Sequence, residues 1–260
     1  MASAAQPAMQ GLPMLYNDLV PLSSVEHATW KMRPLSDLNM IAQVHAVPLT
    51  VEEFPLAQRF FPIVFSSGAE AVPLALMGLN EGVNVFVKDG KFDAGYVPAF
   101  LRRYPWLLAR LNQDQDELSL CFDPLSGLVG EFEDGLPLFE NGQPAQVVTD
   151  TLQFCEQFEI AAQATTQFIK ELNDLNVLED GEFSIQHPSM PQPYNYRGFR
   201  MVNNDKLREL RGDQLRKMNQ NGMLTVLHAH MFSLNLMNDI FGRQWDQGQV
   251  PGAIAANGAA

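Results

Sequence analysis

The spacing of apolar residues changes once along this chain, near Pro144, and that change limits the folds that the chain can adopt. Before it, short apolar runs such as PIVFS and NVFV are separated by Gly, Ser, Asn and Glu, which is typical of strands joined by turns. After it, apolar residues recur every three or four positions from Asp150 to Asn176, which predicts a long amphipathic helix. A β-rich part followed by a helical part indicates the α+β class.

Three apolar runs within 62–87 predict an antiparallel β-meander, and KDGKF supplies an Asp-Gly turn after the third run. The stretch ELSLCFD is a further strand candidate. The segment 124–144 is punctuated by Gly and Pro, so we expect turns and edge strands there. The first half of the chain is therefore predicted to be built from short strands.

The Pro-rich stretch IQHPSMPQPYNYRG is predicted to be an extended connector, because a residue before proline avoids the helical conformation. Beyond it the sequence predicts two short helices with Asp205 and Asp213 as N-caps. The expected fold is an antiparallel β-meander-rich N-terminal half packed with a mainly helical C-terminal half. We expect a single domain over residues 16–242, β-rich to about residue 145 and helical after it, with flexible arms at 1–15 and 243–260.

Two histidines, His228 and His230 in TVLHAHMFSL, raise the question of a shared metal ion. On a β-strand their side chains would project from the same face, whereas on a helix they lie about 200° apart. The apolar run from Met223 to Phe241 is too long for a typical strand and is rich in Leu, Met and Ala. We therefore predict a helix with His230 facing the core and His228 on the other side, and we expect no metal and no cofactor.

The chain carries a net charge of −13, which disfavours general binding to nucleic acid or to anionic lipid. Seven of its 17 basic residues nevertheless fall within positions 197–217, beside only three acidic residues. These positions carry +4, which leaves −17 on the remainder of the chain. We name them the basic segment, and its basic residues are Arg197, Arg200, Lys206, Arg208, Arg211, Arg216 and Lys217. Such a cluster predicts docking of an acidic protein partner, and the alternative is pairing with the chain's own acids.

The stretch GYVPAFLRRYPW holds the densest group of aromatic and cationic residues, in which two guanidinium groups have the donor geometry to bind a carboxylate or phosphate. The other interpretation is that these arginines, Arg102 and Arg103, cap the edge of the sheet. An alternative function is an enzyme or small-ligand-binding protein, with a pocket that uses His27, Arg102, Arg103, Tyr104 and His228. The common zinc-protease, nucleophile-elbow, dinucleotide and phosphate-loop motifs do not occur in the sequence. The acidic stretches GEFEDG and LEDGEF are interpreted as solvated turns.

Two cysteines give no disulfide framework, which fits a reducing compartment. The first residues lack a basic region followed by an apolar one, and no run reaches the roughly 18 apolar residues of a membrane span. We therefore expect a cytoplasmic protein, with signal-less export to the cell surface left open. The sequence does not specify the oligomeric state.

Six blocks of the sequence together resemble the SapC family of bacterial proteins: FPIVFS from Phe61, LALMGLNEGVNVFV from Leu74, GYVPAFLRRYPW from Gly95, LQFCEQFEIAAQAT from Leu152, GFRMVNNDKLREL from Gly198 and NGMLTVLHAHMFSLNLM from Asn221. The resemblance covers roughly residues 14–242. Phe92 stands where the family usually has tryptophan. The resemblance implies a link to a bacterial surface layer and brings no catalytic residues with it. We expect a non-catalytic accessory or interaction protein, surface-layer or envelope related, that docks its partner through the basic segment, which we expect to be helical.

Overall fold

The structure is a computed structural model that describes residues 11–68, 71–111 and 117–249. The chain divides into two compact units. The first combines Met1–Leu35 with Arg103–Gln157, and the second combines Ser36–Arg102 with Phe158–Ala260. The predicted arms fall mainly on residues that lie outside the described ones, although the last helix continues four residues past position 242.

The first unit is made of short antiparallel strands. They are β1 (Val20–Pro21), β2 (Lys31–Met32), β8 (Trp106–Arg110), β9 (Leu118–Phe122), β10 (Val129–Gly130), β11 (Leu136–Pro137), β12 (Phe139–Glu140) and β13 (Gln143–Pro144), with the 3-10 turn η3 (Pro124–Ser126). The sheet orders are β1-β9-β8, β10-β2-β11 and β12-β13. Trp106 and Phe122 lie in the buried core of this unit, with ring centroids 5.4 Å apart. The strand predicted in ELSLCFD and the edge strands after it are confirmed.

The second unit contains a five-stranded antiparallel sheet in the order β14-β15-β4-β5-β3. Its strands are β3 (Ala46–Pro48), β4 (Ile63–Ser66), β5 (Pro73–Leu76), β14 (Leu178–Ile185) and β15 (Tyr194–Val202). Two of the three runs predicted as a meander are the neighbours β4 and β5, but the third is not part of this sheet. It continues into a separate hairpin of β6 (Val87–Lys88) and β7 (Lys91–Phe92).

At the start of the third run, the side chain of Asn84 satisfies backbone groups outside the sheet. The buried Asn84 accepts the Phe86 N–H through Oδ1 at 3.0 Å and donates through Nδ2 to the carbonyl of Ile41. The predicted Asp-Gly turn is confirmed in the β6–β7 hairpin, since Asp89 and Gly90 both have positive φ, at 51° and 73°.

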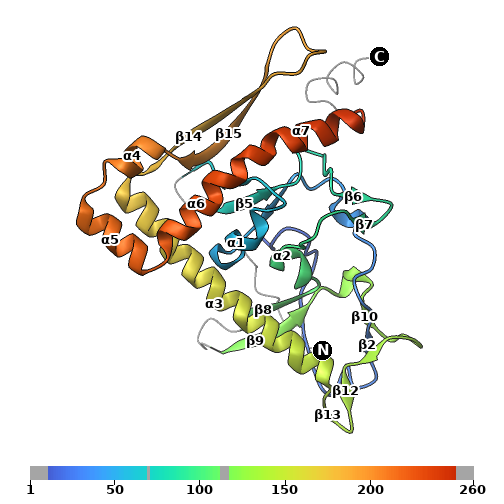
Figure 1. Cartoon of the computed structure of the whole chain (residues 1–260). Helices are drawn as coiled ribbons and strands as arrows, with labels where there is room; N and C mark the ends of the chain where they lie inside the picture. Colours follow the sequence, from blue (N-terminus) through green and yellow to red (C-terminus); the bar gives the residue numbers. More distant parts are fainter. Residues whose placement is uncertain (1–10, 69–70, 112–116, 250–260) are drawn as a thin grey trace. The chain divides into compact units, whose positions relative to one another are not determined.

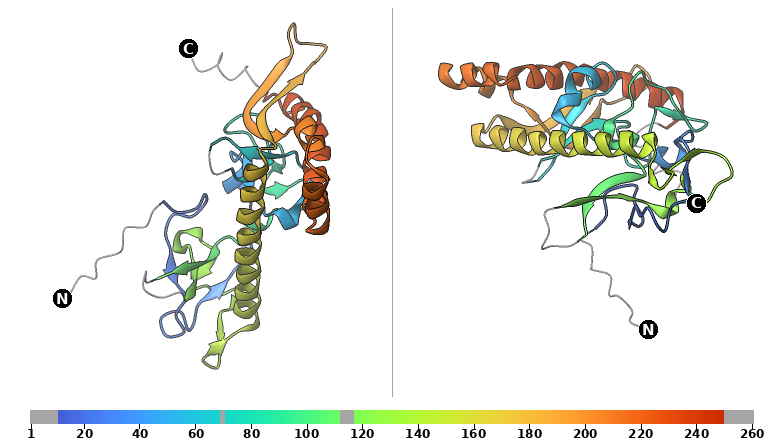
Figure 2. Two further views of the ribbon diagram at one scale, coloured as in Figure 1. Left: turned by 90° about the vertical axis from the view of Figure 1, so that its left-hand side faces the viewer. Right: turned by 90° about the horizontal axis from the view of Figure 1, so that it is seen from below.

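The β14–β15 hairpin corrects two expectations, because these strands lie in the half predicted to be mainly helical. LEDGEF, interpreted as a turn, is most of β14, and the predicted connector contains the start of β15. Their register shifts at Gly181/Glu182, where Gly198 (φ 91°) is the extra residue of a β-bulge. β15 pairs with β4 only through Phe199 and Arg200, so the hairpin extends beyond the rest of its sheet (Figures 1 and 2).

The helices, including 3-10 turns, are η1 (Asn39–Ile41), η2 (Val51–Glu53), α1 (Phe54–Ala57), α2 (Ala99–Arg102), α3 (Gln146–Leu175), α4 (Asn204–Arg208), α5 (Gly212–Gln220), α6 (Met223–Ser233), η4 (Leu234–Leu236) and α7 (Met237–Asp246). The α+β class and the long helix α3 are confirmed. The N-caps of α4 and α5 are Asn203 and Arg211, so the prediction of Asp205 and Asp213 is wrong.

Across the described residues, no helix combines the length and apolar character that crossing a membrane requires.

Candidate functional site

The basic segment follows three consecutive elements of the second unit, β15, α4 and α5 (Figure 1). Its seven basic side chains are exposed or half-buried: Arg197, Arg200, Lys206, Arg208, Arg211, Arg216 and Lys217. The prediction of a wholly helical docking segment is wrong, because Arg197 and Arg200 lie on strand β15. Hydrogen bonding of β15 to both β14 and β4 holds this part of the segment extended.

Two residues of the basic segment pair with acids from other elements of the unit. Arg197 lies opposite Glu182 of β14, and its Nη2 is 2.5 Å from Glu182 Oε1. Lys217 Nζ is 3.6 Å from Glu171 Oε2, on α3. The basic partner is largely exposed in both pairs, so water screens the attraction and the pairs contribute little to stability.

Two further residues pair with acids inside the segment itself. Arg208 Nη1 is 3.5 Å from Asp205 Oδ1 in α4. Arg211 donates a hydrogen bond to Asp213 at 2.7 Å, and this bond lowers the pKa of the Asp213 carboxyl. All four side chains are exposed. Internal pairing, the alternative that the sequence left open, is therefore realised for four of the seven basic residues.

The remaining three residues of the segment are Arg200, Lys206 and Arg216. In the described parts of the chain, no acidic group lies within ion-pair distance of them. We call them the uncompensated cations.

The two histidines of the HxH pattern lie on α6, as predicted. His230 is fully buried and His228 is exposed. Nε2 of His230 accepts the Val202 N–H at 3.1 Å, while Nδ1 lies 2.7 Å from the carbonyl oxygen of Ile63, to which it donates. Ser233 Oγ accepts the Ile63 N–H at 2.9 Å. Both side chains therefore attach α6 to the sheet, and we name them the α6 seam.

The imidazole of His230 occupies the place of a strand–strand contact. β15 and β4 pair Arg200 with Phe65, and the same register continued by two residues would pair Val202 with Ile63. There the ring lies between the two backbones, with one nitrogen bonded to each strand. Burial lowers the pKa of His230 to about 4, so the ring is neutral near pH 7. A neutral ring with both nitrogens bonded to backbone groups has a structural role, and no described group of three His, Cys, Asp or Glu side chains converges on a metal position.

The residues of the predicted ligand pocket belong to both units, and they contact different neighbours. In the second unit, Arg102 is exposed and its Nε donates to the carbonyl oxygen of Val97 at 3.0 Å. The exposed ring of His228 stacks along α6 on Phe232, with centroids 6.1 Å apart. These contacts do not join Arg102 to His228.

In the first unit, His27 is buried and its Nδ1 accepts the Ser23 N–H at 3.0 Å. Its ring centroid lies 4.4 Å from that of Trp30 and 5.2 Å from that of Phe122. Burial in this aromatic cluster lowers the pKa of His27. The histidine is held as part of the packing of its unit.

Arg103 and Tyr104 are also buried in the first unit. The guanidinium of Arg103 lies 5.9 Å from the ring centroid of Tyr16. Burial, reinforced by the charge of Asp123 and a hydrogen bond to it, raises the pKa of Tyr104 to about 12. The shared pocket predicted for His27, Arg102, Arg103, Tyr104 and His228 stays a prediction.

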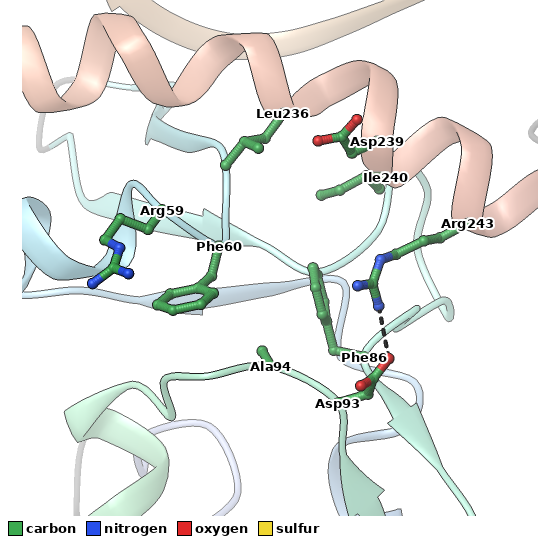
Figure 3. A pocket seen from close by; sticks show the side chains of 9 residues that line it. All are labelled: Arg59, Phe60, Phe86, Asp93, Ala94, Leu236, Asp239, Ile240 and Arg243. Carbon is green, nitrogen blue, oxygen red and sulfur yellow. Dashed lines mark hydrogen bonds and ion pairs between the residues drawn. The ribbon is translucent and has the colours of Figure 1, made fainter.

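A different pocket lies wholly in the second unit, beside η4 and α7 (Figure 3). Phe60 and Phe86 provide aromatic walls, and α7 contributes Asp239, Ile240 and Arg243. The cavity has a volume of about 140 Å³. No sequence pattern revealed it, because its walls come from three stretches that are distant in the chain.

An α+β protein with an exposed basic segment and a small mixed-charge pocket does not by itself indicate a family. A family model described as SapC matches residues 22–240, which is most of the 260-residue chain. The chain therefore belongs to the SapC family, and the resemblance seen in its sequence blocks is confirmed. No curated protein and no solved structure matches the chain.

Proposed function

We propose that this SapC-family protein is a non-catalytic accessory protein that docks an acidic protein partner through the basic segment. The observation that carries the proposal is the set of uncompensated cations, Arg200, Lys206 and Arg216, in a chain whose net charge is −13. A locally positive surface on an acidic protein attracts an acidic partner in one orientation and repels it elsewhere.

The four paired residues of the segment support the same proposal. The basic side chain of each ion pair is largely exposed, and such a pair is worth little because water solvates the cation almost as well. A carboxylate of a partner can replace the chain's own carboxylate at small cost, and the interface excludes water as it forms. The segment thus has three cations ready for contact and four that can exchange partners.

The biological setting that we propose is a bacterial surface layer or another envelope-related system. This part of the proposal rests on the family resemblance alone. The docking part rests on charge and exposure, so the two parts can be tested separately.

Docking by charge can be tested with poly-L-glutamate immobilised on a biosensor surface at low ionic strength. The test variant combines Arg200→Glu, Lys206→Glu and Arg216→Glu. The control variant combines Lys88→Glu, Lys91→Glu and Lys170→Glu, three exposed lysines of the same unit outside the basic segment. Both variants change the net charge by the same amount, so a difference between them reports the position of the charges.

We expect the affinity of the test variant for poly-L-glutamate to be at least roughly tenfold lower than that of the unaltered chain. The affinity of the control variant should fall much less. Binding should also weaken with added salt, because the contact is electrostatic. Equal losses in the two variants, or no binding by the unaltered chain, would contradict the docking proposal. Thermal melts of both variants check that the fold is retained.

A further inference from the structure

The pocket beside α7 has a size that limits what can enter it. Ligand pockets for drug-sized molecules usually enclose roughly 300 to 1,000 Å³. This cavity encloses about 140 Å³, which is close to the roughly 150 Å³ of an engineered cavity that binds benzene. The pocket therefore accommodates one ring-sized apolar group.

The walls of the pocket suit such a group. Phe60 and Phe86 present aromatic side chains, and Ile240 and Leu236 present aliphatic ones from the helical side (Figure 3). An apolar body placed among these side chains loses contact with water, which is the main favourable contribution for a ligand of this size.

One of the two arginines in the wall is already engaged. Arg243 Nη1 is 3.1 Å from Asp93 Oδ2, and its guanidinium lies 4.8 Å from the ring centroid of Phe86. This pair closes one end of the pocket with no net charge. It leaves the pocket's selectivity to the other charged groups.

The other two charges are Arg59 and Asp239, which stand on opposite sides of the pocket (Figure 3). Both side chains are exposed, and neither forms an ion pair with any residue that the structure describes. The guanidinium of Arg59 lies 5.5 Å from the ring centroid of Phe60. A guanidinium on one side and a carboxylate on the other attract opposite charges at the two ends of a ligand.

The geometry points to a binding site for a small zwitterion that carries a carboxylate at one end, an ammonium group at the other and a ring-sized apolar body between them. The carboxylate pairs with Arg59, and the ammonium group pairs with Asp239. The body lies between Phe60 and Phe86. This site is independent of the docking function proposed above, because it uses none of the seven residues of the basic segment.

A suitable probe is 4-(aminomethyl)benzoate, whose benzene ring separates the two charges. Two analogues of nearly the same shape lack one charge each: 4-methylbenzoate has no ammonium group, and 4-methylbenzylamine has no carboxylate. Calorimetric or ligand-observed NMR titration of the full chain compares the three. We expect the zwitterion to bind roughly tenfold more tightly than either analogue, since each analogue loses one charge-assisted contact.

Two single substitutions identify which charge contacts which end. Arg59→Gln should remove the preference for the zwitterion over 4-methylbenzylamine and keep its preference over 4-methylbenzoate. Asp239→Asn should do the reverse. Both residues are exposed, so we expect both variants to fold.

Ala94→Phe, which fills the pocket from its lower edge in Figure 3, should abolish binding of all three compounds. The triple reversal of the uncompensated cations should leave probe binding unchanged, and this separates the pocket from the docking proposal. Equal affinity for the three compounds, no binding of the zwitterion, or identical effects of Arg59→Gln and Asp239→Asn would overturn the assignment. If Ala94→Phe fails to fold, the two charge variants still decide the question.

Discussion

The α6 seam and the basic segment both place polar side chains at strand β15, His230 in the seam and Arg197 and Arg200 in the segment, but burial gives them opposite properties. In the seam, His230 and Ser233 are fully buried and bind backbone groups of two strands. In the basic segment, the cations are exposed or half-buried, and four of them form ion pairs in which the basic side chain is largely exposed. A buried polar group that loses its partner cannot turn to water, whereas an exposed one can. The seam is therefore expected to hold the fold, and the segment to be free for binding.

The substitution His230→Leu should give the largest effect, because it removes the bridge between β15 and β4. Val202 N–H and the Ile63 carbonyl would both lose a partner in a site that water does not reach. Each such loss costs about 1 to 3 kcal/mol, so the free energy of unfolding should fall by about 4 kcal/mol. Urea denaturation followed by circular dichroism measures this change.

The matched control is His228→Leu, the same substitution two residues earlier on the same helix. His228 is exposed, so the free energy of unfolding should change by no more than about 0.5 kcal/mol. If both variants lost a similar free energy of unfolding, burial would not explain the difference between the two histidines.

The second-largest effect should appear in the pH dependence of stability. The folded protein holds the pKa of His230 at about 4, below the ordinary value of 6.5 that applies to the unfolded chain. The unfolded chain therefore binds a proton first as the pH falls, so this residue's contribution is complete above pH 6.5 and is lost towards pH 4. The loss amounts to roughly 3 kcal/mol.

Carboxyl groups also titrate in this range, so the test compares the unaltered chain with His230→Leu. The destabilisation caused by the substitution should shrink as the pH is lowered from 6.5 to 4, because only the unaltered chain then loses the histidine's contribution. A difference that stays constant with pH would mean that His230 does not titrate in this way.

The sequence predicted the helix that carries His230, but it did not predict the strands to which His230 bonds. The run from Met223 to Phe241 was long enough to indicate a helix, and a helix fixed which side of it His230 would occupy. The bridge to Ile63 and Val202 could not be predicted, because these residues are brought to the ring by tertiary packing. The cost of leaving a buried backbone group unbonded explains the arrangement only once the strands are known.

The β14–β15 hairpin was missed because its sequence carries signals that usually indicate turns. Acidic residues beside Gly181 suggested a solvated loop, and three prolines suggested a connector. In the structure the prolines lie between the strands, and Gly181 is a strand residue that makes room for the ring of Phe199. Local composition does not distinguish a glycine that turns the chain from one on which an aromatic ring packs. The pocket beside α7 was missed because its charges come together only through the fold.

The substitution Gly181→Ala tests how tightly the buried face of β15 is packed, and it should lower the stability of the fold. An added Cβ would lie 2.2 Å from an atom of the Phe199 ring, which is buried, so the ring or the strand must shift. Overpacking of this kind costs about 2 kcal/mol. Gly212→Ala is the control, because nothing lies within 4 Å of its added Cβ. A thermal melt in which both variants lose equal stability would contradict the packing argument.

The smallest effect is expected for the ion pair between Lys217 and Glu171, and it tests the exposed side of the comparison. A double-mutant cycle with Lys217→Ala and Glu171→Ala isolates the energy of the pair from the effects of each substitution alone. Because the lysine is largely exposed and the two charged atoms are 3.6 Å apart, the coupling should be below about 1 kcal/mol and should decrease in high salt. A coupling as large as the effect of His230→Leu would mean that the basic segment holds the fold, in which case its cations are not free to exchange their acids for those of a partner.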